Sequence, residues 1–178
     1  MTTIEKITLT EEHLQNLKYH FQPSLTTKLD LINNDFDQEI INEIVLWKVN
    51  RYAELNNDTF LALNTIKRED EHIDLEITKN VLTHLLSTKG IQLAMASTIL
   101  RFKNPKIYQI IDQRVFRFIN GENLPHYFSS TDAQISLYLG YLEKLKIICL
   151  EKQIDFTLSD RIIYELDKEF NGNEKIKY

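Results

Sequence analysis

The sequence predicts an all-α fold, and three observations support that prediction. Apolar residues recur at helical spacing in most long segments, and no segment shows the alternation of a β-strand. The 178 residues include only four glycines and three prolines, too few for the turns of an all-β domain. The sequence contains none of the motifs G-x-G-x-x-G, G-K-[ST] and G-x-S-x-G, which argues against the nucleotide-binding and α/β-hydrolase classes.

Start and stop signals divide the first half of the chain into four helices. These helices are expected over about 10–20, from 35 or 37 to 55, over 58–66 and over 75–87. The first three begin at the capping signals Thr8-x-x-Glu11, Asp35 or Asp37, and Asp58. The segment 22–34 shows no clear pattern, and the charged run 67–72 is expected to be a solvated loop.

The second half of the chain predicts four more helices. They cover about 93–102, 113–119, 131–152 and 160–171. Asn104-Pro105 ends the first of them, because the residue before a proline is driven out of the helical region. Thr131-x-x-Gln134 repeats the capping-box spacing, Ser159 or Asp160 caps the last helix, and Gly172 ends it.

Charge is unevenly distributed along the chain. The net charge is −5, which argues against general binding to polyanions. The window 89–117 nevertheless contains six basic residues and one acid, Asp112, whereas the rest of the chain carries −10. A local basic face on an acidic body favours one oriented anionic partner over non-specific coating.

The single cysteine, Cys149, lies in an apolar run and is expected to be a buried thiol. One thiol excludes an internal disulfide, a four-thiolate zinc site and a four-cysteine iron–sulfur cluster. The first residues lack an apolar signal core, and no stretch approaches the ~20 apolar residues of a membrane span. We therefore expect a cytoplasmic protein that has no membrane partner.

The window 89–119 contains the residues to which we assign chemistry. It predicts a helix, a tight turn at Gly90, a second helix and a loop that ends at Asp112 before a short helix. A tight turn exposes the unpaired N–H groups that begin the second helix, and these favour a phosphate. Gly90 allows close backbone approach, and Lys89 adds charge. An ordinary helix–helix turn that binds nothing is the alternative.

This window resembles the helix-hairpin-helix DNA glycosylase superfamily, which includes endonuclease III, adenine glycosylase and 8-oxoguanine glycosylase. The hairpin is Gly90-Ile91-Gln92-Leu93-Ala94, and Asp112 follows it at the family's spacing. The resemblance implies a two-lobed helical bundle over 1–178, with the hairpin-Asp segment at 75–119, and DNA as the partner. The DNA-binding residues it predicts are Lys89, Gly90, Ile91, Gln92, Leu93, Arg101 and Arg114.

Asp112 is the predicted catalytic residue. Cleavage of an N-glycosidic bond passes through a state with positive charge at C1′, and an adjacent carboxylate stabilises that charge. The same carboxylate can orient or deprotonate a water molecule. An Asp directly before a helix is also a common N-cap, and a capped carboxylate is rigidly placed, so the two roles are compatible.

The hairpin departs from the family pattern at two positions. Ala94 stands where 8-oxoguanine glycosylase has its Schiff-base lysine, so any glycosylase activity is expected to be monofunctional. Gln92 replaces the second glycine of the hairpin, which alters the approach of a phosphate. The iron–sulfur motif is missing and no cofactor is expected, although the resemblance implies that turn carbonyls can hold a monovalent cation.

A flipped base needs aromatic side chains on which to stack. Trp47, Tyr52 and Tyr108 are the predicted pocket residues, and His126 is a further candidate; for Trp47, core packing is the simpler interpretation. Two alternatives to a glycosylase stay open. One is a glycosylase-like fold that has lost catalysis and holds DNA or a protein. The other is a helical interaction protein unrelated to nucleic acid, in which Asp112 faces its own helix.

Overall fold

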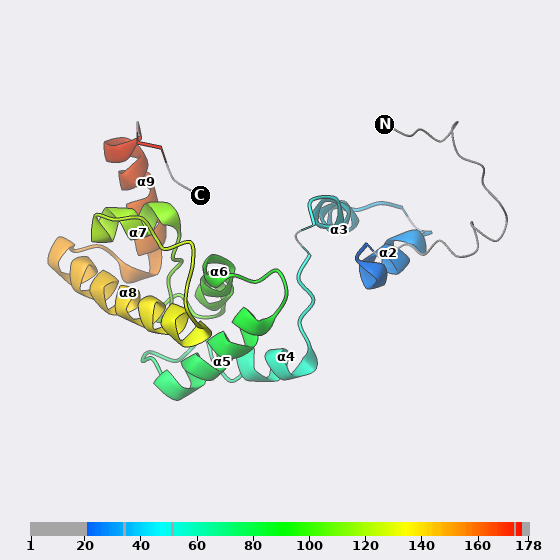
Figure 1. Cartoon of the computed structure of the whole chain (residues 1–178), viewed down its shortest axis with the longest axis horizontal. Helices are drawn as coiled ribbons and strands as arrows, with labels where there is room; N and C mark the ends of the chain where they lie inside the picture. The colour runs from blue at the N-terminus through cyan, green and yellow to red at the C-terminus, as the bar shows by residue number, and fades with distance from the viewer. Residues whose placement is uncertain (1–20, 34, 51, 173, 176–178) are drawn as a thin grey trace. The chain divides into compact units, whose positions relative to one another are not determined.

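We describe a computed structural model of the chain, which covers residues 21–33, 35–50, 52–172 and 174–175. These residues form eight α-helices and one short 3-10 helix, and none of them forms a β-strand. The all-α prediction is therefore confirmed (Figure 1). The helix predicted over 10–20 lies outside the described residues. Among the described helices, none combines the length and apolar content that crossing a bilayer requires.

The chain divides into two compact units between Tyr52 and Ala53. The first unit contains α2 (Pro23–Asp30) and α3 (Gln38–Lys48). Lys28 of α2 forms an ion pair with Glu43 of α3. Trp47 of α3 donates a 2.9 Å hydrogen bond from its indole N–H to the Thr26 hydroxyl. These polar contacts join the two helices, while α3 has no fully buried residue.

The prediction of one long helix through residue 55 is wrong. Asp37 caps α3 as expected, since its carboxylate accepts a 2.9 Å hydrogen bond from the Ile40 N–H. The helix ends at Lys48, because Val49 leaves the helical region and Asn50 adopts a left-handed φ of 53°. Asparagine tolerates that conformation better than most residues, so the chain turns there.

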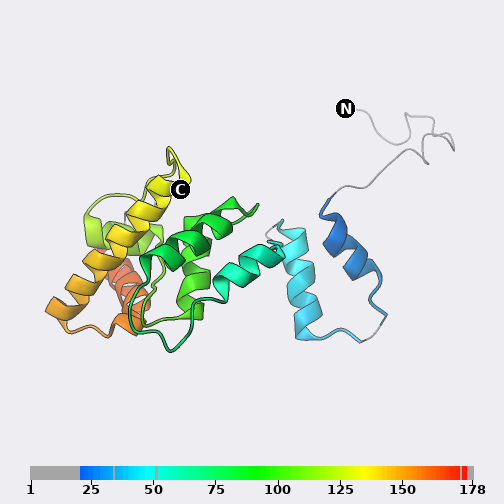
Figure 2. The same ribbon diagram turned by 90° about the horizontal axis from the view of Figure 1, so that it is seen from below.

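The second unit contains the hydrophobic core and the predicted hairpin. Its elements are α4 (Asn57–Leu63), α5 (Leu75–Ser87), α6 (Leu93–Lys103), α7 (Gln113–Asn120), α8 (Thr131–Lys152), a 3-10 turn η2 (Phe156–Leu158) and α9 (Ser159–Asn171). Helix α5 contacts α4, α6 and α8, and α7 packs along α9 (Figures 1 and 2). Fully buried side chains of α5 and α8, including Leu82, Leu85, Tyr138 and Leu145, fill the centre.

Three predicted caps differ from those observed. Asn56, rather than Asp58, caps α4 and accepts a hydrogen bond from the Thr59 N–H at 2.8 Å. Ser130, rather than Thr131, caps α8 and bonds the Ala133 N–H at 3.1 Å. Neither Ser159 nor Asp160 caps α9, because the turn η2 leads directly into that helix and Leu158 takes the N-cap position.

Asn104 anchors the charged loop 67–70 to the end of α6. Its buried side-chain amide donates to the carbonyls of Lys67 at 2.7 Å and Asp70 at 2.9 Å, and its oxygen accepts from the Lys106 N–H at 2.9 Å. The helix stops at Lys103, as the following Asn104-Pro105 predicts. A side chain that satisfies three backbone groups fixes where the loop and the next segment begin.

Candidate functional site

The predicted hairpin is a tight turn between α5 and α6. The Ile91 N–H donates to the Thr88 carbonyl at 3.1 Å, and Gly90 between them has a φ of 89°. Only glycine adopts that conformation without strain, and beyond Gly90 and its two chain neighbours no described atom lies within 4 Å of where a Cβ would stand. Ile91 is buried and fixes the turn to the core, whereas Lys89, Gly90 and Gln92 are exposed.

The start of α6 presents backbone N–H groups that its N-cap residue leaves unpaired. Gln92 occupies the N-cap with an extended backbone, but its side chain makes no capping hydrogen bond. The first backbone bond of the helix runs from the Ala96 N–H to the Gln92 carbonyl at 2.9 Å. The N–H groups before Ala96 therefore point out of the helix, where the helix dipole favours an anion.

Asp112 lies at the N-cap of α7, as predicted. One carboxylate oxygen accepts a 2.8 Å hydrogen bond from the Val115 N–H. The side chain is half-buried, and burial raises its pKa; the N–H groups of Val115 and Arg114 and the charge of Arg114 oppose that rise. A partly desolvated carboxylate in a fixed position suits the stabilisation of a nearby positive charge.

The segment before Asp112 is held by three hydrogen bonds to the surrounding helices. The Tyr138 and Tyr141 hydroxyls of α8 donate to the carbonyls of Gln109 and Ile110 at 2.9 and 2.6 Å. The Ile111 N–H donates to the Ser97 hydroxyl of α6 at 3.1 Å. These side chains fix the backbone from which the Asp112 carboxylate projects.

A cavity of about 480 Å³ brings the hairpin and Asp112 together. Gln92, Leu93 and Ala94 line it from the start of α6, and Asp112 lines it from the start of α7. The loop 124–128 and Gln134 of α8 complete the wall. The two predicted features therefore lie on the same side of the second unit.

The loop that closes this cavity was not predicted as part of the site. The Gln113 amide binds both backbone groups of Leu124, donating to the carbonyl at 2.9 Å and accepting from the N–H at 3.0 Å. This pair of bonds holds the loop beside Asp112. His126, Tyr127 and Phe128 follow on the loop, and Tyr127 is 84% exposed. The aromatic residues that follow Leu124-Pro125 could have indicated this loop from the sequence, but the prediction included only His126 of them.

The other predicted pocket aromatics do not line this cavity. Tyr108 is 1% exposed, and its hydroxyl lies 2.7 Å from the Thr78 hydroxyl in the core. Burial raises the pKa of that hydroxyl. Trp47 and Tyr52 belong to the first unit, where the Trp47 ring packs edge-on against Phe21 at 5.4 Å. Core packing is thus the observed role of Tyr108.

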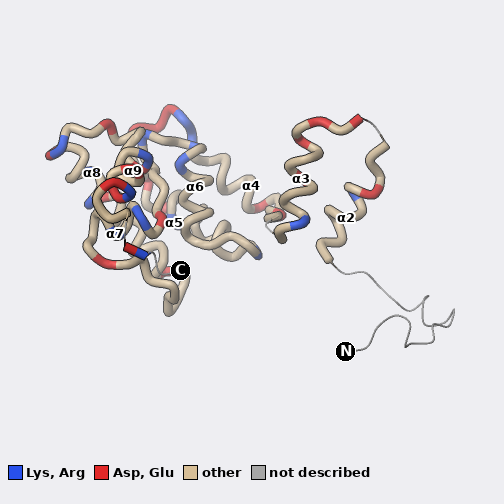
Figure 3. Tube along the Cα trace, turned by 90° about the horizontal axis from the view of Figure 1, so that it is seen from above, with Lys and Arg blue, Asp and Glu red and all other residues tan. Residues whose placement is uncertain are grey.

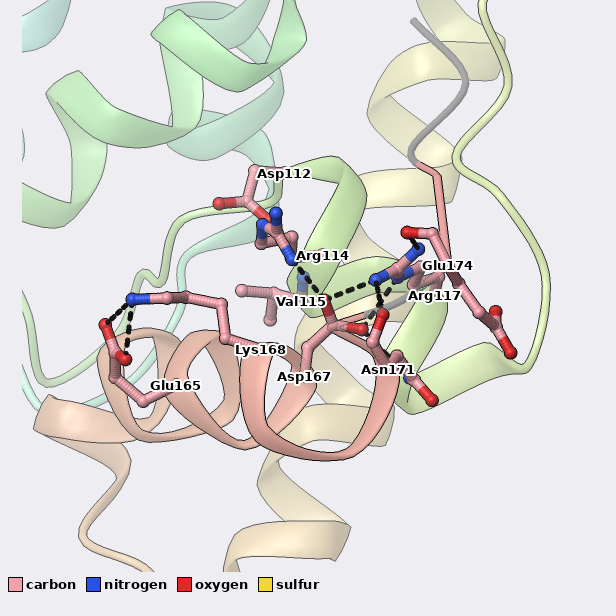
Figure 4. A network of polar contacts seen from close by, with 9 residues as sticks. All are labelled: Asp112, Arg114, Val115, Arg117, Glu165, Asp167, Lys168, Asn171 and Glu174. Carbon is pink, nitrogen blue, oxygen red and sulfur yellow. Dashed lines mark hydrogen bonds and ion pairs between the residues drawn. The ribbon is translucent and has the colours of Figure 1, made fainter.

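Two arginines predicted to bind DNA are engaged inside the second unit. Arg101 is 8% exposed, forms an ion pair with Asp160 at 3.6 Å and donates to the Thr157 carbonyl at 3.1 Å. Arg114 donates to Asp167 at 3.0 Å (Figure 4). Its guanidinium also lies over the Tyr164 ring. Because both guanidinium groups have protein partners, we do not include them in the proposed phosphate contacts.

These pairings reduce the charge that the window 89–117 offers to a partner. Arg117, the third arginine of the window, also binds Asp167, at 2.7 Å. Both basic and acidic positions occur along the trace of the second unit (Figure 3). The exposed charge closest in sequence to the hairpin is Lys89.

The carbonyl of Thr88, in the turn, accepts the Ile91 N–H with one of its two lone pairs. The monovalent cation that the resemblance implies stays a prediction. Among the described residues, no group of three or more His, Cys, Asp or Glu side chains is placed to hold a metal ion.

Comparison with known proteins found no matching family model, no matching curated protein and no matching solved structure.

Proposed function

We propose that the protein is a monofunctional DNA glycosylase that hydrolyses the N-glycosidic bond of a damaged or mismatched base. The observation that carries this proposal is the shared cavity of Asp112 and the uncapped start of α6. An anion-binding element and a fixed carboxylate on one wall match the two charges of the reacting nucleotide, its phosphate and its developing cation.

In this mechanism, the N–H groups of Leu93 and Ala94 bind a backbone phosphate, and Lys89 adds charge beside them. The flipped nucleotide enters the cavity, where the loop aromatics Tyr127 and Phe128 offer stacking surfaces. As the bond from C1′ to the base nitrogen breaks, its electron pair leaves with the base. Asp112 stabilises the positive charge left at C1′, and a water molecule then adds to that carbon.

Ala94 determines which products form. An amine at this position would attack C1′ and lead to strand cleavage through a Schiff base. Ala94 has no such group, although it lines the cavity. Water is therefore the nucleophile, and the product is an abasic site in an intact strand.

One observation favours a second candidate, a non-catalytic DNA-binding module. Arg101 forms an ion pair with Asp160, and Arg114 and Arg117 form ion pairs with Asp167. Fewer positive charges are therefore available to bind DNA than the sequence indicates. Such a module would bind DNA through the hairpin without releasing a base.

A substrate panel tests the proposal. Duplexes that carry oxidised, alkylated, deaminated or mismatched bases are incubated with the protein, and free base and strand breaks are measured separately. We expect base release from at least one duplex, with strand breaks only after alkali treatment. Salt-dependent binding without base release on any substrate would favour the second candidate. A slope of log K against log[salt] near zero would contradict both, because phosphate contacts release counterions.

A further inference from the structure

Three cations, Lys67, Arg68 and Lys103, lie where α4 and α6 end, outside the cavity of the proposed site. We call them the helix-end cluster. The Lys67 ammonium donates to the Asn64 carbonyl at 2.7 Å, and the Lys103 ammonium donates to the Asn64 side-chain oxygen at 2.7 Å. The Arg68 guanidinium donates to the Phe102 carbonyl at 3.3 Å. Two ammonium groups thus bind one residue, and the guanidinium binds the position next to Lys103.

The protein partners of the helix-end cluster are all uncharged oxygens. Of the described carboxylates, none forms an ion pair with Lys67, Arg68 or Lys103. The nearby acids of the same loop have other positions. Asp70 accepts a 2.9 Å hydrogen bond from the Lys67 backbone N–H, and Asp70 and Glu71 line a separate cavity. The cluster therefore differs from the three arginines described above, whose charges are paired with aspartates.

The ends of the two helices do not balance this positive charge. The C-terminus of a helix carries a partial charge of about −0.5, so α4 and α6 together supply about one negative charge against the three cations. An ammonium group has three N–H donors and a guanidinium has five, and each of these side chains uses one in the described contacts. Because like charges repel, the remaining charge and donors favour an anion that accepts several hydrogen bonds.

We propose that the helix-end cluster binds the phosphate backbone of DNA at a surface separate from the hairpin. Phosphate oxygens accept several hydrogen bonds, and the planar guanidinium of Arg68 matches their geometry. The Phe102 ring, which is 60% exposed, stands at the same end of α6. Cations beside an exposed aromatic ring are typical of surfaces that bind nucleic acids. This inference rests on the proposed function only for the choice of DNA as the partner.

Helix α6 connects the helix-end cluster to the proposed site. The helix begins at Leu93 in the hairpin and ends at Lys103. Its 11 residues make it about 16 Å long. Successive phosphates of one strand are separated by a rise of about 3.4 Å along the axis of B-DNA, so this length corresponds to about five phosphates. A duplex of about 20 base pairs is therefore long enough to reach both ends of α6.

The salt dependence of the affinity for DNA tests this surface. Fluorescence anisotropy measures binding of an undamaged duplex to wild type and to Lys67→Gln, Arg68→Gln and Lys103→Gln over a range of salt concentrations. Each substitution should reduce the slope of log K against log[salt] by about 0.9, which corresponds to a roughly eightfold loss of affinity at 0.1 M salt. The three side chains bind exposed neutral oxygens, so we expect these variants to fold.

Lys168→Gln is the matched control for the change in net charge. Lys168 lies on α9, where its ammonium forms an exposed ion pair with Glu165 at 2.9 Å. Its substitution removes one positive charge from the protein but none from the helix-end cluster, so the slope should stay at the wild-type value. Wild-type slopes in all three cluster variants, or an equal reduction in Lys168→Gln, would overturn the proposal.

Two further measurements identify the partner and separate this inference from the proposed function. If wild type binds polyglutamate as tightly as the duplex and the cluster variants do not, the cluster recognises acidic polypeptides and the choice of DNA is wrong. Reduced slopes without base release from any damaged duplex would keep the cluster and reject the glycosylase function. Base release with unchanged slopes would keep that function and reject the cluster.

Discussion

The Asp112→Asn protein is expected to release base at least about 100-fold more slowly than wild type, while its affinity for duplex DNA stays the same. Asparagine caps helices as well as aspartate does, so the hydrogen bond to the Val115 N–H and the start of α7 should persist. In the proposed mechanism the substitution removes the negative charge that stabilises the cation at C1′, and losses of one transition-state contact commonly reach 10²–10³-fold. Single-turnover kinetics and a binding titration measure the two quantities.

Asp74→Asn provides the matched control for this experiment. Asp74 caps α5 through a 3.0 Å hydrogen bond from the Ile77 N–H, but it does not border the cavity of the proposed site. The same chemical change at an equivalent cap should leave base release unaltered. Equal rates in wild type and Asp112→Asn would defeat the catalytic assignment, and an equal loss in both variants would trace the effect to helix capping.

Replacing Asp167 by alanine is expected to lower the free energy of unfolding by about 3–5 kcal/mol, the usual cost of removing one partner from a buried ion pair. Asp167 is fully buried between α7 and α9 and accepts hydrogen bonds from Arg117 at 2.7 and 2.8 Å (Figure 4). Arg114 and Asn171 each add one more, at 3.0 Å. Without the carboxylate, the buried Arg117 guanidinium loses the two hydrogen bonds that Asp167 accepts from it.

Urea denaturation of wild type, Asp167→Ala and Glu165→Ala measures the loss of free energy of unfolding in each variant. The Glu165–Lys168 pair on the same helix is exposed, so its loss should cost less than about 1 kcal/mol. Similar midpoints for Asp167→Ala and wild type would show that the network does not stabilise the contact between α7 and α9.

The stability of the protein in acid should depend on Asp167. Burial alone would raise the pKa of Asp167, but hydrogen bonds from Arg117, Asn171 and Arg114 outweigh it and lower the pKa. A lowered folded-state pKa gives stability that is complete above the unfolded pKa and is lost as the pH falls through the folded value. The difference in the free energy of unfolding between wild type and Asp167→Ala should therefore become smaller at pH values below the ordinary pKa range of aspartate. Urea denaturation over a series of pH values measures this difference.

Local signals in the sequence predicted much of the second unit. Helix α5 was predicted at its observed bounds, α6 and α7 to within one residue, and the Asp112 cap at its observed position, because caps and breaks act on neighbouring backbone groups. The two wrong cap predictions, for α4 and α8, also follow from the local nature of these signals. Two capping side chains lay within two residues of each other, and the sequence pattern alone did not show which one the helix uses.

Contacts between distant segments limited the prediction of the site. Arg101 and Arg114 resembled free cations in sequence, but their partners Asp160 and Asp167 lie more than fifty residues further along the chain. Two hydrogen bonds between Gln113 and Leu124 hold the loop 124–128 in the cavity wall. No periodic pattern in the sequence predicts these bonds. Tyr108 was predicted to line the base pocket, but it does not line the cavity beside Asp112. Its side chain is 1% exposed and its hydroxyl lies 2.7 Å from that of Thr78, thirty residues earlier in the chain, a contact that residue type does not show.

The most direct test of the account compares two abasic-site analogues in the same duplex. One carries a neutral tetrahydrofuran ring, and the other a pyrrolidine ring whose positive charge lies close to the position of C1′ and so mimics the charge of the transition state. We expect wild type to bind the charged analogue more tightly than the neutral one, and Asp112→Asn to bind both equally. Equal affinity of wild type for the two analogues, or a preference that survives in Asp112→Asn, would contradict a carboxylate that faces the sugar carbon.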